Sequence, residues 1–178
     1  MMNLLIIITG AVGAALMPTW VLQLRSDYDI SIRCVLTPSA ERFLSPNAMA
    51  AITGQPTYLE SSWGVSGRAI HKELAYWADK VLVAPASLNS MSKIMQLDSS
   101  NLALATVAFT AAPTYIVPAV SGPVTRKDRY KELLASLRKD YTLILPSMND
   151  ASVSLVDFNP EEGGMATYED VKSKLQLG

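Results

Sequence analysis

Apolar segments alternate along the chain with turns that are rich in glycine, proline and serine. The first segment contains the β-branched run Ile6–Ile8, which stops at Thr9-Gly10 and is typical of a buried strand. Apolar residues then recur at roughly helical intervals between Val12 and Leu24. On length alone, the uncharged stretch before Arg25 could be a transmembrane helix or a signal peptide. Because it has no positive start and is broken by a glycine turn, we expect a strand, a turn and a helix.

The same alternation continues to the end of the chain. Further strands are predicted at 30–36, 80–84, 114–117 and 141–145. Helices are predicted at 38–44 (with Ser39 as the cap), 47–52, 71–79, 88–95, 101–109, 126–139 and 168–177, and loops at 53–68 and 146–164. Strands that alternate with helices predict an α/β fold, a single domain over residues 1–178 with an open, mostly parallel sheet and helices on both faces.

Composition narrows the function classes. Of 178 residues, 49% are hydrophobic and only 17% are charged, where about 25% is usual for a soluble domain. This chain is too apolar for intrinsic disorder, and its net charge of −1, with scattered Lys and Arg, does not predict a nucleic-acid partner. One cysteine, Cys34, and one histidine, His71, do not suffice for a zinc site of the usual type, so no metal is expected. With a membrane segment set aside, the apolar excess indicates surface that is covered by other copies of the chain.

Three turns that follow predicted strands carry small or hydroxyl residues: Thr9–Gly13, Thr37–Ser39 and Pro85–Ser90. Each places backbone N–H groups at the start of a helix, where the helix dipole favours an anion. Parallel strands bring such turns to one edge of the sheet, so together they could hold a nucleotide phosphate and its sugar. Taken singly, each turn is also explained by packing or by helix capping.

Two isolated side chains, His71 and Cys34, are candidates for a chemical role. His71 begins a predicted helix, and an imidazole is suited to proton transfer near neutral pH, although a surface or capping role is the simpler alternative. Cys34 lies within a predicted strand, where a free cysteine usually acts as a small hydrophobe.

Several short motifs carry a family resemblance. PASLNS at 85–90 resembles the PASANT motif of the homo-oligomeric flavin-containing cysteine decarboxylases. This family includes peptidyl-cysteine decarboxylases of the epidermin type and phosphopantothenoylcysteine decarboxylases. ITGAVGA, LTPSAERFL and HKELAYWAD resemble three further family motifs, and the pair N-L at 101–102 and GGM at 163–165 resemble two more, in the family's order.

The resemblance implies a Rossmann-like flavoprotein with FMN as its cofactor and His71 as the catalytic base. It implies a cytoplasmic homotrimer, in some members assembled to a dodecamer, with FMN at the interface between subunits. The FMN contacts carried over by position are Gly10, Ala11, Val12, Thr37, Ser39, Ser87, Leu88, Asn89, Ser90 and Ala119.

Two departures bear on the substrate. The family's second motif, P-x-M-N-x-x-M-W, would begin at Pro118, so Ser121 replaces the asparagine that contacts the substrate carboxylate. A single hydroxyl therefore replaces a side-chain amide, which has a separate acceptor oxygen and donor nitrogen. The loop 146–164 resembles the substrate clamp of the epidermin type, with Met148 and Asn149 as substrate contacts. It is acidic and contains no cysteine, which disfavours a phosphorylated substrate and a product that is reduced again.

The resemblance therefore favours FMN-dependent oxidative decarboxylation of the C-terminal cysteine of a ribosomally made precursor peptide. The product would be an aminoenethiol, the precursor of aminovinyl-cysteine rings. Phosphopantothenoylcysteine decarboxylase, flavin prenyltransferase and a non-catalytic flavin-binding regulatory subunit remain alternatives.

Overall fold

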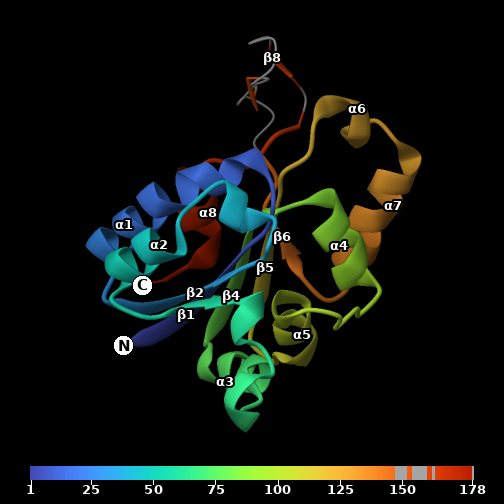
Figure 1. Ribbon diagram of the computed structural model, residues 1–178. Helices are drawn as coiled ribbons and strands as arrows, with labels where there is room; N and C mark the ends of the chain where they lie inside the picture. The colour runs from blue at the N-terminus through green and yellow to red at the C-terminus, as the bar shows by residue number, and fades with distance from the viewer. Residues whose placement is uncertain (147–151, 154–159, 162, 178) are drawn as a thin grey trace.

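The computed structural model of the protein describes residues 1–146, 152–153, 160–161 and 163–177. Its centre is a six-stranded parallel sheet in the order β3-β2-β1-β4-β5-β6, with helices on both faces (Figure 1). The strands are β1 (Met2–Ile8), β2 (Ile30–Leu36), β3 (Thr57–Leu59), β4 (Lys80–Ala86), β5 (Thr114–Pro118) and β6 (Thr142–Leu143). The predicted α/β class with an open parallel sheet is confirmed.

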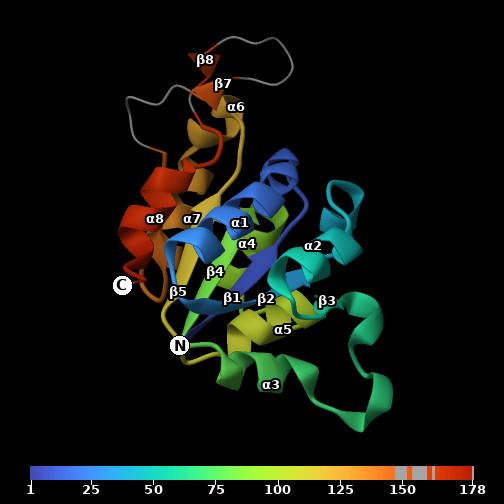
Figure 2. The same cartoon turned by 90° about the vertical axis from the view of Figure 1, so that its left-hand side faces the viewer.

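The helices form one layer on each side of this sheet (Figure 2). On one face lie α1 (Met17–Asp27), α2 (Pro46–Thr53) and α8 (Tyr168–Leu175). On the other lie α3 (Ile70–Trp77), α4 (Leu88–Met95), α5 (Leu102–Phe109) and α7 (Asp128–Leu137). Short elements complete the described chain: the 3-10 turns η1 (Val12–Leu16), η2 (Ala40–Arg42), η3 (Glu60–Ser62) and η4 (Val65–Gly67), helix α6 (Gly122–Thr125) and the antiparallel pair β7 (Ser152–Val153) and β8 (Pro160–Glu161).

Strand β1 holds the two layers together because its side chains alternate between them. Leu4, Ile6 and Ile8 enter the core beneath α1, α2 and α8. Leu5 and Ile7 enter the core beneath α3, α4, α5 and α7. All five are at most 1% exposed. This explains the unbroken apolar sequence, since a central parallel strand is covered on both faces.

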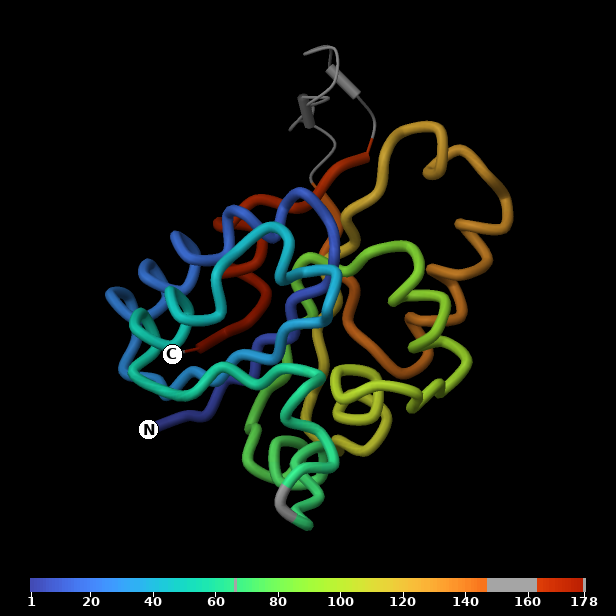
Figure 3. The backbone as a smooth tube through the Cα atoms, viewed as in Figure 1, coloured from blue at the N-terminus to red at the C-terminus, as the bar shows by residue number. Residues whose placement is uncertain are grey.

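The first 24 residues form the predicted strand, turn and helix, traced from the N-terminus in Figure 3. The turn is followed by the 3-10 segment η1, and α1 begins only at Met17. Among the helices of the described chain, none is long and apolar enough to cross a membrane.

Three predicted elements differ from the structure. The segment 53–68 was expected to be a loop, but Thr57–Leu59 pairs with β2 as an edge strand of only three half-buried residues, too short to show a sequence period. The helix predicted at 38–44 is a single 3-10 turn, which Ser39 does not cap through its side chain. Strand β6 covers two residues of the predicted 141–145.

The last helix is fastened to the first by a small polar cluster. Lys172 Nζ lies 2.6 Å from Asp27 Oδ2, and the Tyr168 hydroxyl donates to the same carboxylate at 3.0 Å. These hydrogen bonds, that of Lys172 first, hold the pKa of Asp27 below its usual range. These contacts therefore fasten the C-terminal helix α8 to α1 on the same face of the sheet.

Leu97 offers a test of local strain at the end of α4. Its φ is 55° although it is not glycine, and the bonds Leu97 N–H to Ile94 C=O and Asp98 N–H to Lys93 C=O form a Schellman motif around it. Its side chain is 67% exposed, so truncation removes little packing. We expect Leu97→Gly to raise the free energy of unfolding by about 0.5–1 kcal/mol, because glycine adopts this conformation without the steric cost. Urea denaturation measures the change, and Leu97→Ala, which keeps the Cβ, should give no such gain.

Candidate functional site

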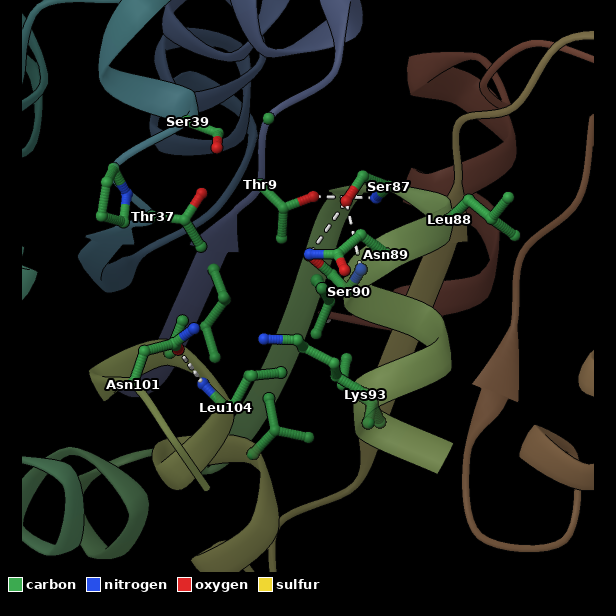
Figure 4. Close-up of a pocket in the computed structure, with 17 residues that line it drawn as sticks. Thr9, Thr37, Ser39, Ser87, Leu88, Asn89, Ser90, Lys93, Asn101 and Leu104 are labelled. Carbon is green, nitrogen blue, oxygen red and sulfur yellow. Dashed lines mark hydrogen bonds between the residues drawn. The ribbon is translucent and has the colours of Figure 1, made fainter. Parts of the chain in front are cut away.

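A cavity of about 400 Å3 opens where β1, β2 and β4 end and where α4 and α5 begin (Figure 4). All three turns singled out in the sequence reach it. Its polar lining consists of Thr9, Thr37, Ser39, Ser87, Asn89, Ser90, Lys93 and Asn101. Its apolar lining includes Ile7, Val83, Ile94, Leu104 and Val107. One site therefore combines hydroxyl, amide and ammonium groups with apolar walls.

Thr9 joins the end of β1 to the turn that starts α4. Its buried hydroxyl donates to the Pro85 carbonyl at 2.7 Å. The same hydroxyl accepts from the Ser87 N–H at 2.8 Å (Figure 4). Ser87 in turn caps α4, because its hydroxyl accepts from the Ser90 N–H at 3.2 Å. The two serine hydroxyls are 3.0 Å apart. The positions of the residues at this helix start thus depend on Thr9.

Thr9→Val should therefore destabilise the protein more than its small change in shape suggests. Valine keeps the volume but leaves the half-buried Ser87 N–H without its acceptor and the buried Pro85 carbonyl without one of its two donors, and a buried group left unpaired costs about 1–3 kcal/mol. We expect a loss of about 2 kcal/mol in the free energy of unfolding, measured by urea denaturation. Thr106→Val is the matched control: Thr106 is also buried, but its hydroxyl only donates to Leu102 in its own helix. An equal loss in both variants would contradict this role of Thr9.

The turn after β1 and the turn after β2 approach closely at Gly10. A Cβ built on Gly10 would lie 2.3 Å from Ser39 Cβ and 3.1 Å from its carbonyl carbon. The second turn is held by the Thr37 N–H, which donates to the Ile8 carbonyl at 3.1 Å. Thr37, and not Ser39, caps the following 3-10 turn, since its hydroxyl accepts from the Ala40 N–H at 3.3 Å. Only glycine fits at position 10 with these turns in place.

The structure brings seven of the predicted cofactor contacts to this cavity: Gly10, Thr37, Ser39, Ser87, Leu88, Asn89 and Ser90. The other three do not line it. Ala11 and Val12 follow in the first turn, and Ala119 lies at the end of β5, where its N–H donates to the Ala86 carbonyl at 3.0 Å.

Of the predicted substrate contacts, only Ser121 is among the described residues. It precedes α6 and follows Val120, whose carbonyl accepts from the Gly164 N–H at 2.6 Å. The GGM segment therefore returns beside Ser121. Met148 and Asn149 lie outside the described residues, as does most of the predicted clamp.

His71 does not line the cavity. It is the second residue of α3, where Trp63 Nε1 donates to its Nδ1 at 3.2 Å and the ring of Phe109 lies 5.3 Å away. Helix α5 links the two places, because Asn101 and Leu104 line the cavity near its start and Phe109 ends it. Within one chain, the predicted base is therefore not among the residues that line the cavity with the predicted cofactor contacts.

Lys93 and Asn101 line the cavity but were not predicted as site residues, and Thr9 was predicted only as part of the first turn and not as a cofactor contact. Lys93 lies four residues after Asn89 on α4, so helical spacing could have placed both on one face. Asn101 caps α5, with its Oδ1 accepting from the Leu104 N–H at 2.9 Å, and the sequence marked it only as part of the N-L pair. In the part of the chain that the structure describes, no three His, Cys, Asp or Glu residues are grouped as metal ligands.

Comparison with known proteins agrees with this architecture. The model of the family described as Flavoprotein matches residues 1–176. The Coenzyme A biosynthesis bifunctional protein CoaBC of Vibrio cholerae serotype O1 is 31% identical over 119 residues, which are 62% of this chain and 28% of that protein. The match thus spans less than a third of that relative's length.

Two solved structures are similar over nearly the whole chain. The FMN-dependent cysteine decarboxylase SpaF superposes with a TM-score of 0.82 and 25% identity, covering 97% of this chain and 93% of SpaF. The FMN binding protein AtHal3 gives a TM-score of 0.77 and 25% identity, with 98% and 95% covered. The chain therefore belongs to the Flavoprotein family, and the resemblance to the flavin-containing cysteine decarboxylases that its motifs indicated is confirmed.

Proposed function

We propose that this protein oxidatively decarboxylates the C-terminal cysteine of a ribosomally made precursor peptide to an aminoenethiol. The observation that carries the proposal is the cavity at the ends of β1, β2 and β4, where the three turns of the cysteine decarboxylase pattern converge. The chain-long similarity to SpaF supports the decarboxylase chemistry. The peptide substrate rests on the clamp motif at 146–149, which lacks a cysteine.

FMN is the cofactor of this family fold, and the cavity fits it. Hydroxyls of Ser39 and Ser87 and the N–H groups at the start of α4 suit the phosphate and the ribityl chain. The apolar walls suit a flat aromatic ring system. Glycine at position 10 lets the turns after β1 and β2 approach each other at this cavity, because a Cβ there would lie 2.3 Å from Ser39 Cβ. When bound, FMN supplies a two-electron acceptor.

The substrate chemistry requires three changes at the cysteine. The thiol loses its proton, and Cβ loses one hydrogen with its electron pair, which leaves a carbon–sulfur double bond. This thioaldehyde accepts the electron pair of the bond between Cα and the carboxylate, so CO2 leaves and an enethiolate remains. Protonation gives the enethiol, and the net loss is CO2 and two hydrogen atoms.

His71 acts at the sulfur of the substrate, and a second copy of the chain brings it to the cavity. This assembly, a homotrimer or a larger multiple of it, accounts for the absence of His71 from the cavity lining within one chain. It is supported by exposed aromatic side chains around His71. Phe109, which contacts the imidazole, is 52% exposed, and Tyr76, on helix α3 with His71, is 84% exposed.

Ser121 contacts the substrate carboxylate from the end of β5. Its hydroxyl offers one hydrogen bond to a carboxylate oxygen. Met148 and Asn149 contribute to the clamp that covers the peptide end and keeps water away from the reaction. The return of residues 163–165 to Val120 supports this arrangement, since it ties the end of the clamp segment to the Ser121 turn.

The deciding experiment incubates the FMN-loaded protein in air with synthetic peptides that end in cysteine and follows their masses. We expect the loss of CO2 and two hydrogen atoms. Peptides that end in serine are the matched control and should stay unchanged, because their hydroxyl cannot take part in the thioaldehyde route. Unchanged cysteine peptides would contradict the proposal, and turnover of phosphopantothenoylcysteine in a parallel reaction would identify the alternative that the CoaBC relatives suggest.

A further inference from the structure

The hydrogen bond between Trp63 and His71 determines where the imidazole carries its proton. An indole N–H donates and never accepts, so His71 Nδ1, 3.2 Å from Trp63 Nε1, must present a lone pair. In the neutral ring the single proton then resides on Nε2. We propose that Trp63 is a positioning residue that holds His71 in this tautomer, so that His71 meets the substrate as a hydrogen-bond donor.

Trp63 is itself held by a chain of hydrogen bonds. The backbone N–H of Trp63 donates to the Glu60 carbonyl at 3.0 Å, which closes the 3-10 turn η3. The Glu60 carboxylate accepts from the Leu102 N–H at 2.9 Å, in the first turn of α5. The turn that carries Trp63 is thereby tied to the helix that also supplies Phe109.

The imidazole lies between two aromatic rings. The ring of Trp63 is 5.9 Å from it, at an interplanar angle of 82°, and the ring of Phe109 is 5.3 Å away at 68°. Both contacts are edge-on, so the orientation of His71 is set from two sides. Among the residues that the structure describes, none forms a hydrogen bond with Nε2.

This arrangement changes the role expected for His71. With a proton on Nε2 and Trp63 on Nδ1, the neutral ring has no lone pair free for the thiol proton. It offers an N–H instead, which suits the ionised sulfur of a cysteine thiolate. A free thiol has a pKa of about 8.5, so a fraction is already ionised at neutral pH, and the donor favours binding of that form. This part of the inference rests on the proposed function, whereas the tautomer does not.

Nitrogen NMR tests the tautomer directly, because the chain contains one histidine and its signals need no assignment. In the protein labelled with 15N-histidine, at a pH where the ring is neutral, we expect Nδ1 to resonate as an unprotonated nitrogen and Nε2 as a protonated one. Trp63→Phe keeps an aromatic ring but removes the N–H donor, and should shift both signals toward each other as the tautomers mix. Signals that do not move in Trp63→Phe would overturn the proposal.

Two controls keep this test decisive. Trp77 lies on α3, the helix that carries His71, but its ring contacts Arg33 and not His71. Trp77→Phe should therefore leave the histidine signals in place. A scalar coupling across the hydrogen bond from Trp63 Nε1 to His71 Nδ1 can be measured in the unmutated protein and needs no variant. Absence of this coupling would also overturn the proposal.

Turnover separates the donor role from the base role. The side-chain amide of glutamine can donate from near the position of Nε2 but cannot act as a base, whereas that of asparagine is too short to reach it. We expect His71→Gln to retain at least about tenfold more turnover than His71→Asn, and Trp63→Phe to lose about fivefold with FMN still bound. Equal loss in both His71 variants would refute the donor role. If the unmutated protein decarboxylates no peptide, the proposed function fails while the NMR result still decides the tautomer.

Discussion

Replacing Gly10 with alanine should weaken FMN binding by at least about 100-fold, equivalent to about 2.7 kcal/mol. The added Cβ would lie 2.3 Å from Ser39 Cβ, a distance that real structures do not tolerate. Ser39 cannot rotate away, because the conflict involves its Cβ and its backbone. The turns after β1 and β2 must therefore separate, and both line the cavity. Titration of FMN into the apoprotein, followed by quenching of flavin fluorescence, measures the affinity.

Gly13→Ala is the matched control for this prediction. Its Cβ would lie 2.9 Å from the Met165 sulfur, but that contact is with the end of a flexible side chain, which can move. We expect its FMN affinity to stay within about threefold of the unmutated protein, less than 1 kcal/mol. If Gly10→Ala binds FMN as tightly as Gly13→Ala, the cofactor does not depend on the close approach of the two turns.

The convergence of the turns could be predicted because one rule governs it. Parallel strands end on the same side, so small residues after β1, β2 and β4 had to meet once the strands were identified. The PASLNS motif also predicted that Ser87 and Asn89 supply polar groups where these turns meet. Strand β3 could not be predicted, since its three half-buried residues become a strand only through pairing with β2.

The position of His71 relative to the cavity could not be predicted from the sequence, for a different reason. The helix that carries His71 was predicted, but its packing against α5 depends on contacts between segments far apart in the chain. The bond from Trp63 to His71 is of the same kind: the segment 53–68 was expected to be a loop, and nothing in its pattern aims an indole at an imidazole. Sequence thus located the residues, and tertiary packing decided which of them meet.

Replacing His71 with asparagine should lower turnover by about 100- to 1,000-fold and leave FMN bound. The loss follows from the removal of the imidazole N–H, the group assigned to the substrate sulfur. The retention follows from the fold, because His71 does not line the cavity that the cofactor contacts share. Flavin absorbance of the purified variant and mass spectrometry of a cysteine-ended peptide measure the two properties.

The contrast between the two variants locates each function in the molecule. Gly10→Ala should lose the cofactor first and activity as a consequence, whereas His71→Asn should lose activity with the cofactor in place. Tyr76→Phe, on the same helix as His71, keeps the aromatic ring and removes only a hydroxyl, so it controls for changes in α3 and should keep both properties. A colourless His71→Asn protein would mean that His71 supports cofactor binding, and normal turnover in it would remove His71 from the reaction altogether. Loss of the cofactor in Gly10→Ala, and loss of turnover alone in His71→Asn, is the result expected if the cavity holds the cofactor and His71, which does not line it within one chain, acts on the substrate.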